Sequence, residues 1–308
     1  MPAPLKPPAL KPGVQICVVS PASPAEQGAL DRGLAELTQL GFRPQVAEHA
    51  AGRKGYFAGS HKERWTDLTS SFRVGACDAV VCSRGGYGST YLLDRVNASN
   101  FPATKILLGY SDVTALQAFL WQKLGWVTFY GPMVAAGFDK GAAGYDEPSF
   151  RSATCQAAGG WQIELQGESM VNGTAEGVVL GGCLTMIETT LGTPWELDTT
   201  DAILLLEDRG MKPFQVDRAV MHLRQAGKFA HVRAIVLGEF PECEAPVGSE
   251  DVRSMVGRFV KGWNVPVVWG AAIGHTARPM LTLPLGIRAR LECDASRTQL
   301  SCLEPAVV

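Results

Sequence analysis

Three polar residues follow apolar, strand-like runs at widely separated points of this 308-residue chain. Ser111 lies in "KILLGYSDV", Glu207 ends "DAILLLE", and His275 follows a glycine in "AAIGHTARP". In this order they would supply a nucleophile, an acid that orients an imidazole, and a general base. A serine at the start of a helical pattern is also a good N-cap, so spacing alone leaves both roles open for Ser111.

The other acids and histidines of the chain are weaker candidates for the same chemistry. Asp208 adjoins Glu207 and is equally acidic, while Asp198 and Asp217 have less favourable settings. Side chains alternate along a strand, which predicts that Glu207 and Asp208 point in opposite directions and that one of them faces His275. The remaining histidines lack a strand-end setting: His49, His61, His222 and His231.

The glycine-rich run "SRGGYGST" follows another strand-like segment. It is either a tight turn or a loop in which Gly85 or Gly86 brings a backbone N–H close to a substrate oxygen. Arg84 offers a guanidinium fork for a carboxylate. The full G-x-G-x-x-G pattern and a Walker lysine are missing, so a nucleotide phosphate loop is weakly supported. After Ser111, the N–H of Asp112 would be a second oxyanion donor at a helix N-terminus.

Composition limits the function classes. A hydrophobic share of 46%, with 19% charged residues and a net charge of −2, describes an ordinary globular protein without nucleic acid or membrane as its main partner. No apolar run approaches the roughly 18 residues of a spanning helix, and the N-terminus lacks a signal-peptide core. We expect the eight cysteines to be reduced in a cytoplasmic protein. No C-x-x-C or H-E-x-x-H occurs, so neither a metal nor another cofactor is expected.

The first half of the chain alternates strand and helix patterns. Apolar runs at 14–20, 77–83 and 105–109 predict buried strands, and Ser60 with Glu63 makes a capping-box pattern ahead of a helix. Continuous apolar strands separated by amphipathic helices predict a parallel sheet covered on both faces. Ligands of such sheets bind at the carboxyl ends of the strands, where the glycine loop and "GYSD" both fall.

The second half predicts a smaller, more β-rich α/β domain. Its strands are "DAILLLE", "RAIVLGEF" and "VPVVWG", and "IRARLECDASRTQLSCLE" alternates around a turn as an antiparallel hairpin does. We predict an N-terminal nucleophile domain over 1–150, a linker over 151–173 and a C-terminal domain over 174–308 that carries the acid and the base. The site would then lie between the domains.

These residues occur within longer motifs that resemble the LD-carboxypeptidases, the serine peptidase family of murein tetrapeptide carboxypeptidase and the microcin C immunity peptidases. The resemblance covers nearly the whole chain. It rests on five motifs in the same order: "SRGGYGSTYLLD", "LLGYSDVTALQ" with "VTFYGPM", "LGGCLTMIETTLGTPWE", "LLLEDRGMKPFQVDRAV" and "GHTARPMLTLPLG".

The resemblance implies a cytoplasmic peptidase, often a homodimer, that removes the terminal D-alanine from murein tetrapeptides of recycled peptidoglycan. It assigns the nucleophile to Ser111, the acid to Glu207 and the base to His275, with no metal. Oxyanion donors would be the N–H groups of Asp112 and of Gly85 or Gly86, and Arg84 would bind the substrate carboxylate. The chain departs from its relatives at Cys183, where they usually carry Asn, so hydrogen bonding there is open.

Three other functions remain to be separated from this one. An amidase of the same family would cleave a peptidyl- or aminoacyl-nucleotide, as the microcin C immunity peptidases do. A non-catalytic muropeptide-binding protein would not need all three catalytic side chains. An α/β-hydrolase esterase would want glycine where this chain has Val113.

Overall fold

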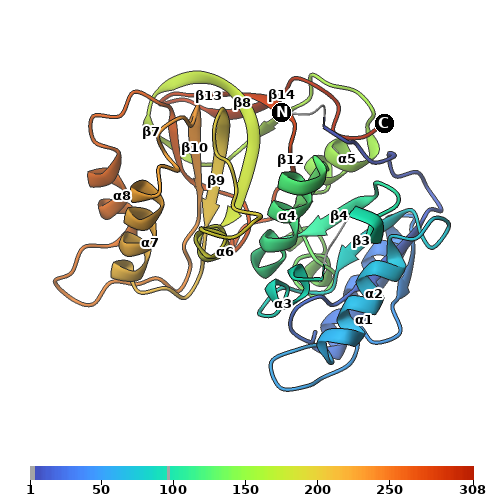
Figure 1. Ribbon diagram of the computed structural model, residues 1–308. Helices are drawn as coiled ribbons and strands as arrows, with labels where there is room; N and C mark the ends of the chain where they lie inside the picture. The colour runs from blue at the N-terminus through green and yellow to red at the C-terminus, as the bar shows by residue number, and fades with distance from the viewer. Residues whose placement is uncertain (1–3, 96–97) are drawn as a thin grey trace.

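The computed structural model describes residues 4–95 and 98–308 of the chain. Its strands form two sheets, the first mainly from the first half of the chain and the second from the second half (Figure 1). Helices flank both sheets. The expected α/β class, with a mainly parallel N-terminal sheet and a β-rich second part, is confirmed.

The first sheet has six strands, in the order β12 (Leu283–Leu285), β5 (Thr128–Tyr130), β4 (Ile106–Gly109), β3 (Ala79–Cys82), β1 (Gln15–Val19) and β2 (Arg43–Val46). The pairings from β2 to β5 are parallel, as the continuous apolar runs predict. β12 pairs antiparallel with β5, although it comes from the second half of the chain.

Helices cover both faces of this sheet. They are α1 (Gln27–Gln39), α2 (His61–Ser71), α3 (Thr90–Leu93), α4 (Thr114–Leu124) and α5 (Glu147–Cys155), with 3-10 turns η1 (Ala98–Asn100), η2 (Ser111–Val113) and η3 (Phe138–Ala143). The predicted capping box begins α2, since Ser60 Oγ accepts from Glu63 N–H and Glu63 Oε2 accepts from Ser60 N–H. α1 and α5 pack on one face, while α2 and α4 pack on the other.

The second sheet has eight strands, in the order β6 (Gln162–Glu164), β14 (Thr298–Cys302), β13 (Arg288–Cys293), β8 (Gly173–Cys183), β9 (Ala202–Glu207), β10 (Ala234–Gly238), β11 (Val267–Ala271) and β7 (Glu168–Val171). The central strands β8 to β11 are parallel, and the flanking ones are antiparallel. The predicted C-terminal hairpin is formed by β13 and β14. The helices are α6 (Leu184–Thr189), α7 (Pro213–Gln225) and α8 (Val252–Val260).

The segment 151–173, expected to be a linker, contributes the end of α5 and the strands β6 and β7. Both strands pair within the second sheet, whereas β12 returns to the first sheet. The chain therefore passes between the two sheets more than once. The predicted domain boundaries remain a prediction.

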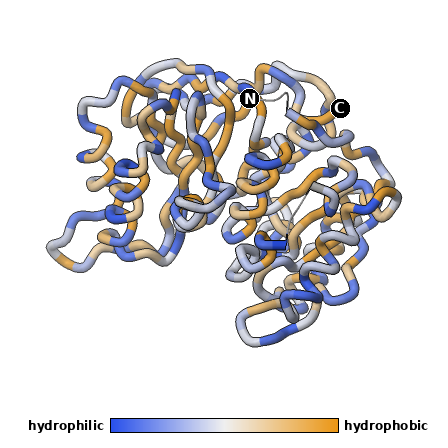
Figure 2. The backbone as a smooth tube through the Cα atoms, in the orientation of Figure 1, coloured by the Kyte–Doolittle hydropathy of each residue, from blue (hydrophilic) through white to orange (hydrophobic). Residues whose placement is uncertain are grey.

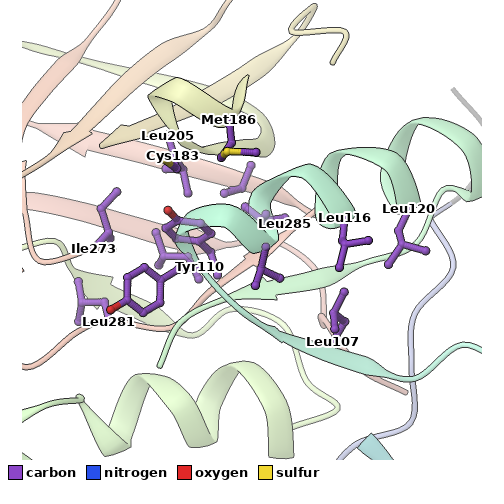
Figure 3. Packing of buried hydrophobic residues seen from close by; sticks show 14 of the residues in the cluster. Leu107, Tyr110, Leu116, Leu120, Cys183, Met186, Leu205, Ile273, Leu281 and Leu285 are labelled. Atoms are coloured by element: carbon purple, nitrogen blue, oxygen red, sulfur yellow. The ribbon is translucent and has the colours of Figure 1, made fainter. Parts of the chain in front are cut away.

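Apolar side chains fill three buried clusters, and the central strands of both sheets, such as β4 and β9, are largely hydrophobic (Figure 2). One cluster joins the two halves: Tyr110 and Leu116 belong to the same buried cluster as Cys183, Met186 and Ile273 (Figure 3). This shared core holds the carboxyl ends of β4 and β9 in a fixed relation. All eight cysteines are free. Among the described residues, no helix has the length and hydropathy to cross a membrane.

Candidate active site

The backbone turns sharply where β4 meets the helix that follows it. Tyr110 is still extended, whereas Ser111 has φ 64°, in the left-handed region. A residue with a Cβ costs about 1–2 kcal/mol there, so the surrounding packing must hold this conformation. Ser111 is not the N-cap of a helix: it is the first residue of the 3-10 turn η2, and α4 begins only at Thr114, with Val113 as its N-cap. The geometry is therefore that of a strained strand-to-helix turn rather than a plain N-cap.

The glycine loop lies directly against this turn. A Cβ placed on Gly85 would be 2.8 Å from Ser111 Cβ and 3.1 Å from Ser111 Oγ. Gly86 has φ 103°, and a Cβ there would be 2.4 Å from Ser23 Oγ. Glycine at position 85 lets the loop backbone approach the Ser111 hydroxyl, and glycine at position 86 leaves room for Ser23.

Asp112 connects the turn to the same glycine loop through hydrogen bonds. Its carboxylate accepts hydrogen bonds from the N–H groups of Ser89 (2.8 Å) and Gly88 (3.3 Å), and Ser89 Oγ donates to its carbonyl oxygen (2.6 Å). Burial raises the pKa of Asp112, while these hydrogen bonds and the nearby Arg64 oppose the rise. The side chain is thus structural, and its backbone N–H remains the candidate oxyanion donor.

Glu207 and His275 form a tight pair at the end of β9. Glu207 is fully buried, and its Oε2 accepts from both the backbone N–H and the Nδ1 of His275, each at 2.8 Å. Because a carboxylate can only accept, Nδ1 carries the hydrogen and Nε2 is left to accept a proton. Gly274, with φ 60°, allows the close approach, since a Cβ there would be 2.3 Å from the Glu207 carboxyl carbon.

Tyr130 is a site residue to which the sequence analysis gave no role. It ends β5, is fully buried, and donates a 2.5 Å hydrogen bond to Glu207 Oε1. Its hydroxyl also accepts from the N–H of Ser111 at 3.5 Å. Burial, followed by the charge of Glu207, raises the pKa of Tyr130 well above its usual range, so the phenol stays a donor. A tyrosine at the end of a buried strand was the available signal.

Asp208 and Cys183 form a separate group on the same wall. Asp208 accepts from the N–H groups of Thr185 and Arg209, each at 2.8 Å, and from the Cys183 thiol at 3.5 Å. Glu207 and Asp208 therefore bind different partners, as strand alternation predicts. Burial, then the charges of Asp208 and Glu207, raises the pKa of Cys183 well above its usual range, so the thiol is protonated.

One cleft of about 440 Å³ brings these groups together. It is lined by Arg84, Gly85, Gly86, Tyr110, Ser111, Asp112, Met133, Ala136, Cys183, Thr185, Met186, Asp208, Arg209 and His275. Both halves of the chain contribute to it, and Glu207 lies buried behind His275. Arg84 donates to the Pro24 carbonyl at 3.4 Å, and Arg209, which the sequence analysis did not single out, pairs with Glu242.

The weaker candidates are engaged elsewhere. His49 pairs with Asp67, His61 with Arg64, and His222 with Glu188; Asp217 pairs with Arg258, Asp198 accepts from Thr200 N–H, and the carbonyl of His231 accepts from Asp201 N–H. None of these six acids and histidines lines the cleft. Within 4–95 and 98–308, no group of three or more His, Cys, Asp or Glu side chains is arranged to hold a metal ion.

Comparison with known proteins identifies the family of the chain. Residues 16–131 match the LD-carboxypeptidase N-terminal domain, and residues 176–291 match the LD-carboxypeptidase C-terminal domain. A probable murein peptide carboxypeptidase of Bacillus subtilis is 32% identical over 293 residues, which are 93% of this chain and 91% of that protein.

Two solved structures are similar over almost their full lengths. The microcin C7 self-immunity protein MccF is 25% identical, with a TM-score of 0.92 over 99% of this chain and 100% of MccF. The muramoyltetrapeptide carboxypeptidase of Oxalobacter formigenes is 27% identical, with a TM-score of 0.84 over 94% of this chain and 99% of that one. Sequence and fold agree: this chain belongs to the LD-carboxypeptidase family, a family of peptidases.

Proposed function

We propose that this protein is a serine carboxypeptidase that hydrolyses the L,D bond to the terminal D-alanine of murein tetrapeptides. The observation that carries the proposal is the arrangement of one cleft. Ser111 has a strained backbone beside Gly85, and His275, paired with Glu207, lines the same cleft. A strained serine beside loop N–H groups and a carboxylate-bound imidazole are the parts that acyl transfer needs.

Each residue then has a defined step. Ser111 Oγ attacks the scissile carbonyl carbon, and His275 Nε2 accepts the hydroxyl proton. Glu207 holds Nδ1–H and stabilises the imidazolium that forms. The N–H groups of Asp112 and of Gly85 or Gly86 bind the tetrahedral oxyanion. When the C–N bond breaks, the imidazolium protonates the amine of the departing D-alanine, and water then hydrolyses the acyl-enzyme by the same route.

Recognition of a free carboxylate is assigned to arginine. Arg84 and Arg209 both line the cleft, from opposite halves of the chain. Each guanidinium already has one acceptor, Pro24 O or Glu242, and retains further N–H groups for a substrate. Two arginines suit a tetrapeptide, which carries acidic groups besides its terminal carboxylate. We assign the terminal carboxylate of the substrate to Arg84. We propose that Arg209 is the second arginine of the cleft that binds the tetrapeptide.

The names of the relatives support a murein substrate. Both the Bacillus subtilis protein and the Oxalobacter formigenes structure are named for murein or muramoyl peptides. MccF favours a second candidate, the amidase of the microcin C immunity type, because its fold matches with a TM-score of 0.92. In keeping with the family resemblance, we also propose a homodimer that works in the cytoplasm.

Mass spectrometry of purified disaccharide tetrapeptide incubated with the protein tests the reaction. We expect loss of one alanine and a tripeptide product, and no reaction with Ser111→Ala. A peptidyl-nucleotide assayed in parallel separates the second candidate. Hydrolysis of the nucleotide alone would overturn the murein assignment, and turnover that survives Ser111→Ala would overturn the serine mechanism.

A further inference from the structure

Four aromatic rings gather beside the glycine loop, and we call them the aromatic platform: Phe57, His61, Tyr87 and Tyr91. Tyr87 and Tyr91 are each 46% exposed, although both rings are held in place. Tyr87 stacks on Phe57 with ring centroids 5.5 Å apart, and Tyr91 stacks on His61 at 4.6 Å. The two tyrosine hydroxyls are 3.1 Å apart and hydrogen bonded. Large exposed rings in a fixed arrangement are typical of binding surfaces.

Buried groups hold the platform from beneath. Arg64 is 1% exposed, and its guanidinium lies 4.9 Å over the Phe57 ring, contacts His61 Nδ1 and donates to the Gly88 carbonyl at 2.8 Å. Burial, then the charges of Arg64, Arg95 and Lys54, lowers the pKa of His61, so its ring is neutral near neutral pH. A platform that is rigid before binding loses little conformational entropy when a ligand arrives.

The platform lies close to the proposed nucleophile. Ser23 Oγ accepts from the N–H of Tyr87 at 3.1 Å, which fixes the loop backbone just beyond the cleft. Gly85 touches Ser111, and Tyr87 is two residues further on. At a maximum of about 3.6 Å per residue, the Tyr87 backbone is within about 12 Å of Ser111.

The length of the proposed substrate matches this separation. Three residues lie between the scissile carbonyl of a tetrapeptide and its amino end, which joins the muramoyl sugar. Extended, they span about 10 Å. Bound with its scissile carbonyl at Ser111, the peptide can therefore bring the sugar to the exposed tyrosine rings.

We propose that the aromatic platform is a subsite for the muramoyl sugar of the substrate, an inference that rests on the proposed function. A pyranose presents C–H groups on its faces and hydroxyls at its edge. Tyr87 and Tyr91 offer uncharged ring faces with phenolic hydroxyls beside them, which suits both features. The subsite makes the enzyme prefer sugar-linked tetrapeptide over free tetrapeptide.

Steady-state kinetics on disaccharide tetrapeptide and on free tetrapeptide test the subsite. We expect wild-type kcat/KM to be higher on the sugar-linked substrate, and the ratio of the two values to fall about tenfold in Tyr91→Ala, mainly through KM. Tyr91→Phe keeps the ring and should hold the ratio within about twofold of wild type. Phe214→Ala is the matched control, because it removes an exposed ring in the first turn of α7 that belongs neither to the platform nor to the lining of the cleft. Thermal melts check that each variant folds, and Tyr87→Leu is the second platform variant.

The possible outcomes separate the subsite from the reaction. D-alanine release with equal wild-type kcat/KM on both substrates would overturn the subsite and leave the proposed function standing. A ratio unaltered in both Tyr91→Ala and Tyr87→Leu would do the same. No D-alanine release from either substrate would overturn both proposals. If Tyr91→Ala specifically weakened hydrolysis of a peptidyl-nucleotide, the platform would bind a base and not a sugar.

Discussion

Tyr130 Oη lies 2.5 Å from Glu207 Oε1, and this hydrogen bond joins the two sheets directly behind the cleft. Tyr130 ends β5 of the first sheet, and Glu207 ends β9 of the second. The other carboxylate oxygen holds His275. Because the Tyr130 hydroxyl also accepts from Ser111 N–H, Tyr130 contacts both the proposed nucleophile and the acid that holds the proposed base.

Tyr130→Phe should lower kcat by about 10–100-fold, because the buried Oε1 loses its donor and the carboxylate is freer to turn away from His275. The free energy of unfolding should fall by about 1–3 kcal/mol. Tyr145→Phe is the matched control, since Tyr145 is also buried and donates to Glu36 Oε1 at 2.7 Å away from the cleft. Similar stability losses with a kcat loss confined to Tyr130→Phe would assign a positioning role to Tyr130; equal kcat values would refute it.

Exchanging the two adjacent acids for amides tests the triad. Glu207→Gln keeps an oxygen for His275 but removes the negative charge, so turnover should drop by about two to four orders of magnitude with folding largely retained. Asp208→Asn alters a carboxylate that binds the N–H groups of Thr185 and Arg209, so it should affect turnover much less. The reverse ranking of kcat would show that the acid has been assigned to the wrong residue.

Gly85→Ala tests the close approach of the loop to Ser111. Its Cβ would be 2.8 Å from Ser111 Cβ, so the loop or the serine must shift, and kcat/KM should fall by at least about 100-fold. Gly257→Ala in α8 is the control, because its Cβ would meet Met170 Cε at an ordinary 3.5 Å. That variant should be active and about 0.5–1 kcal/mol more stable. An active Gly85→Ala enzyme would exclude this loop from the site.

The sequence predicts well which residues lie at the ends of strands, but it predicts poorly which strands pair with each other. Ser111, Glu207 and His275 each follow a strongly apolar run, and the structure brings all three to one place. The pairing of β12 with β5 had no sequence signal, since a strand of three residues takes its partner from tertiary packing.

Two further features of the site have no signal in the local sequence. In "VTFYGPM", Tyr130 looks like an ordinary core residue, because its acceptor Glu207 is 77 residues away. The positive φ of Ser111 could not be read from a serine whose type suits an N-cap. Both depend on contacts between distant segments, which a pattern in one segment does not contain.

The pair of His49 and Asp67 predicts a pH dependence of stability. His49 Nδ1 lies 2.8 Å from Asp67 Oδ1, and this hydrogen bond raises the pKa of His49 above its usual value. Because the pKa of His49 is higher in the folded than in the unfolded state, the pair stabilises the folded state fully below the unfolded-state pKa. This stabilisation is lost as the pH rises through the folded-state pKa. The Tm difference between wild type and His49→Gln should therefore be larger at about pH 6 than at about pH 9. A difference that grows with pH would contradict this pairing.

Cys183 provides the last test, because its thiol is a second potential nucleophile in the lining of the cleft. Its pKa is raised by burial and by Asp208 and Glu207, so the thiolate needed for attack is not formed near neutral pH. Cys183→Ala removes the weakest of three donors to Asp208 and leaves two N–H groups in place. Turnover should therefore stay within about threefold of wild type, whereas Ser111→Ala should lose at least about 1,000-fold. If Cys183→Ala lost as much activity as Ser111→Ala, while its thermal melt remained that of a folded protein, the nucleophile would have to be reassigned.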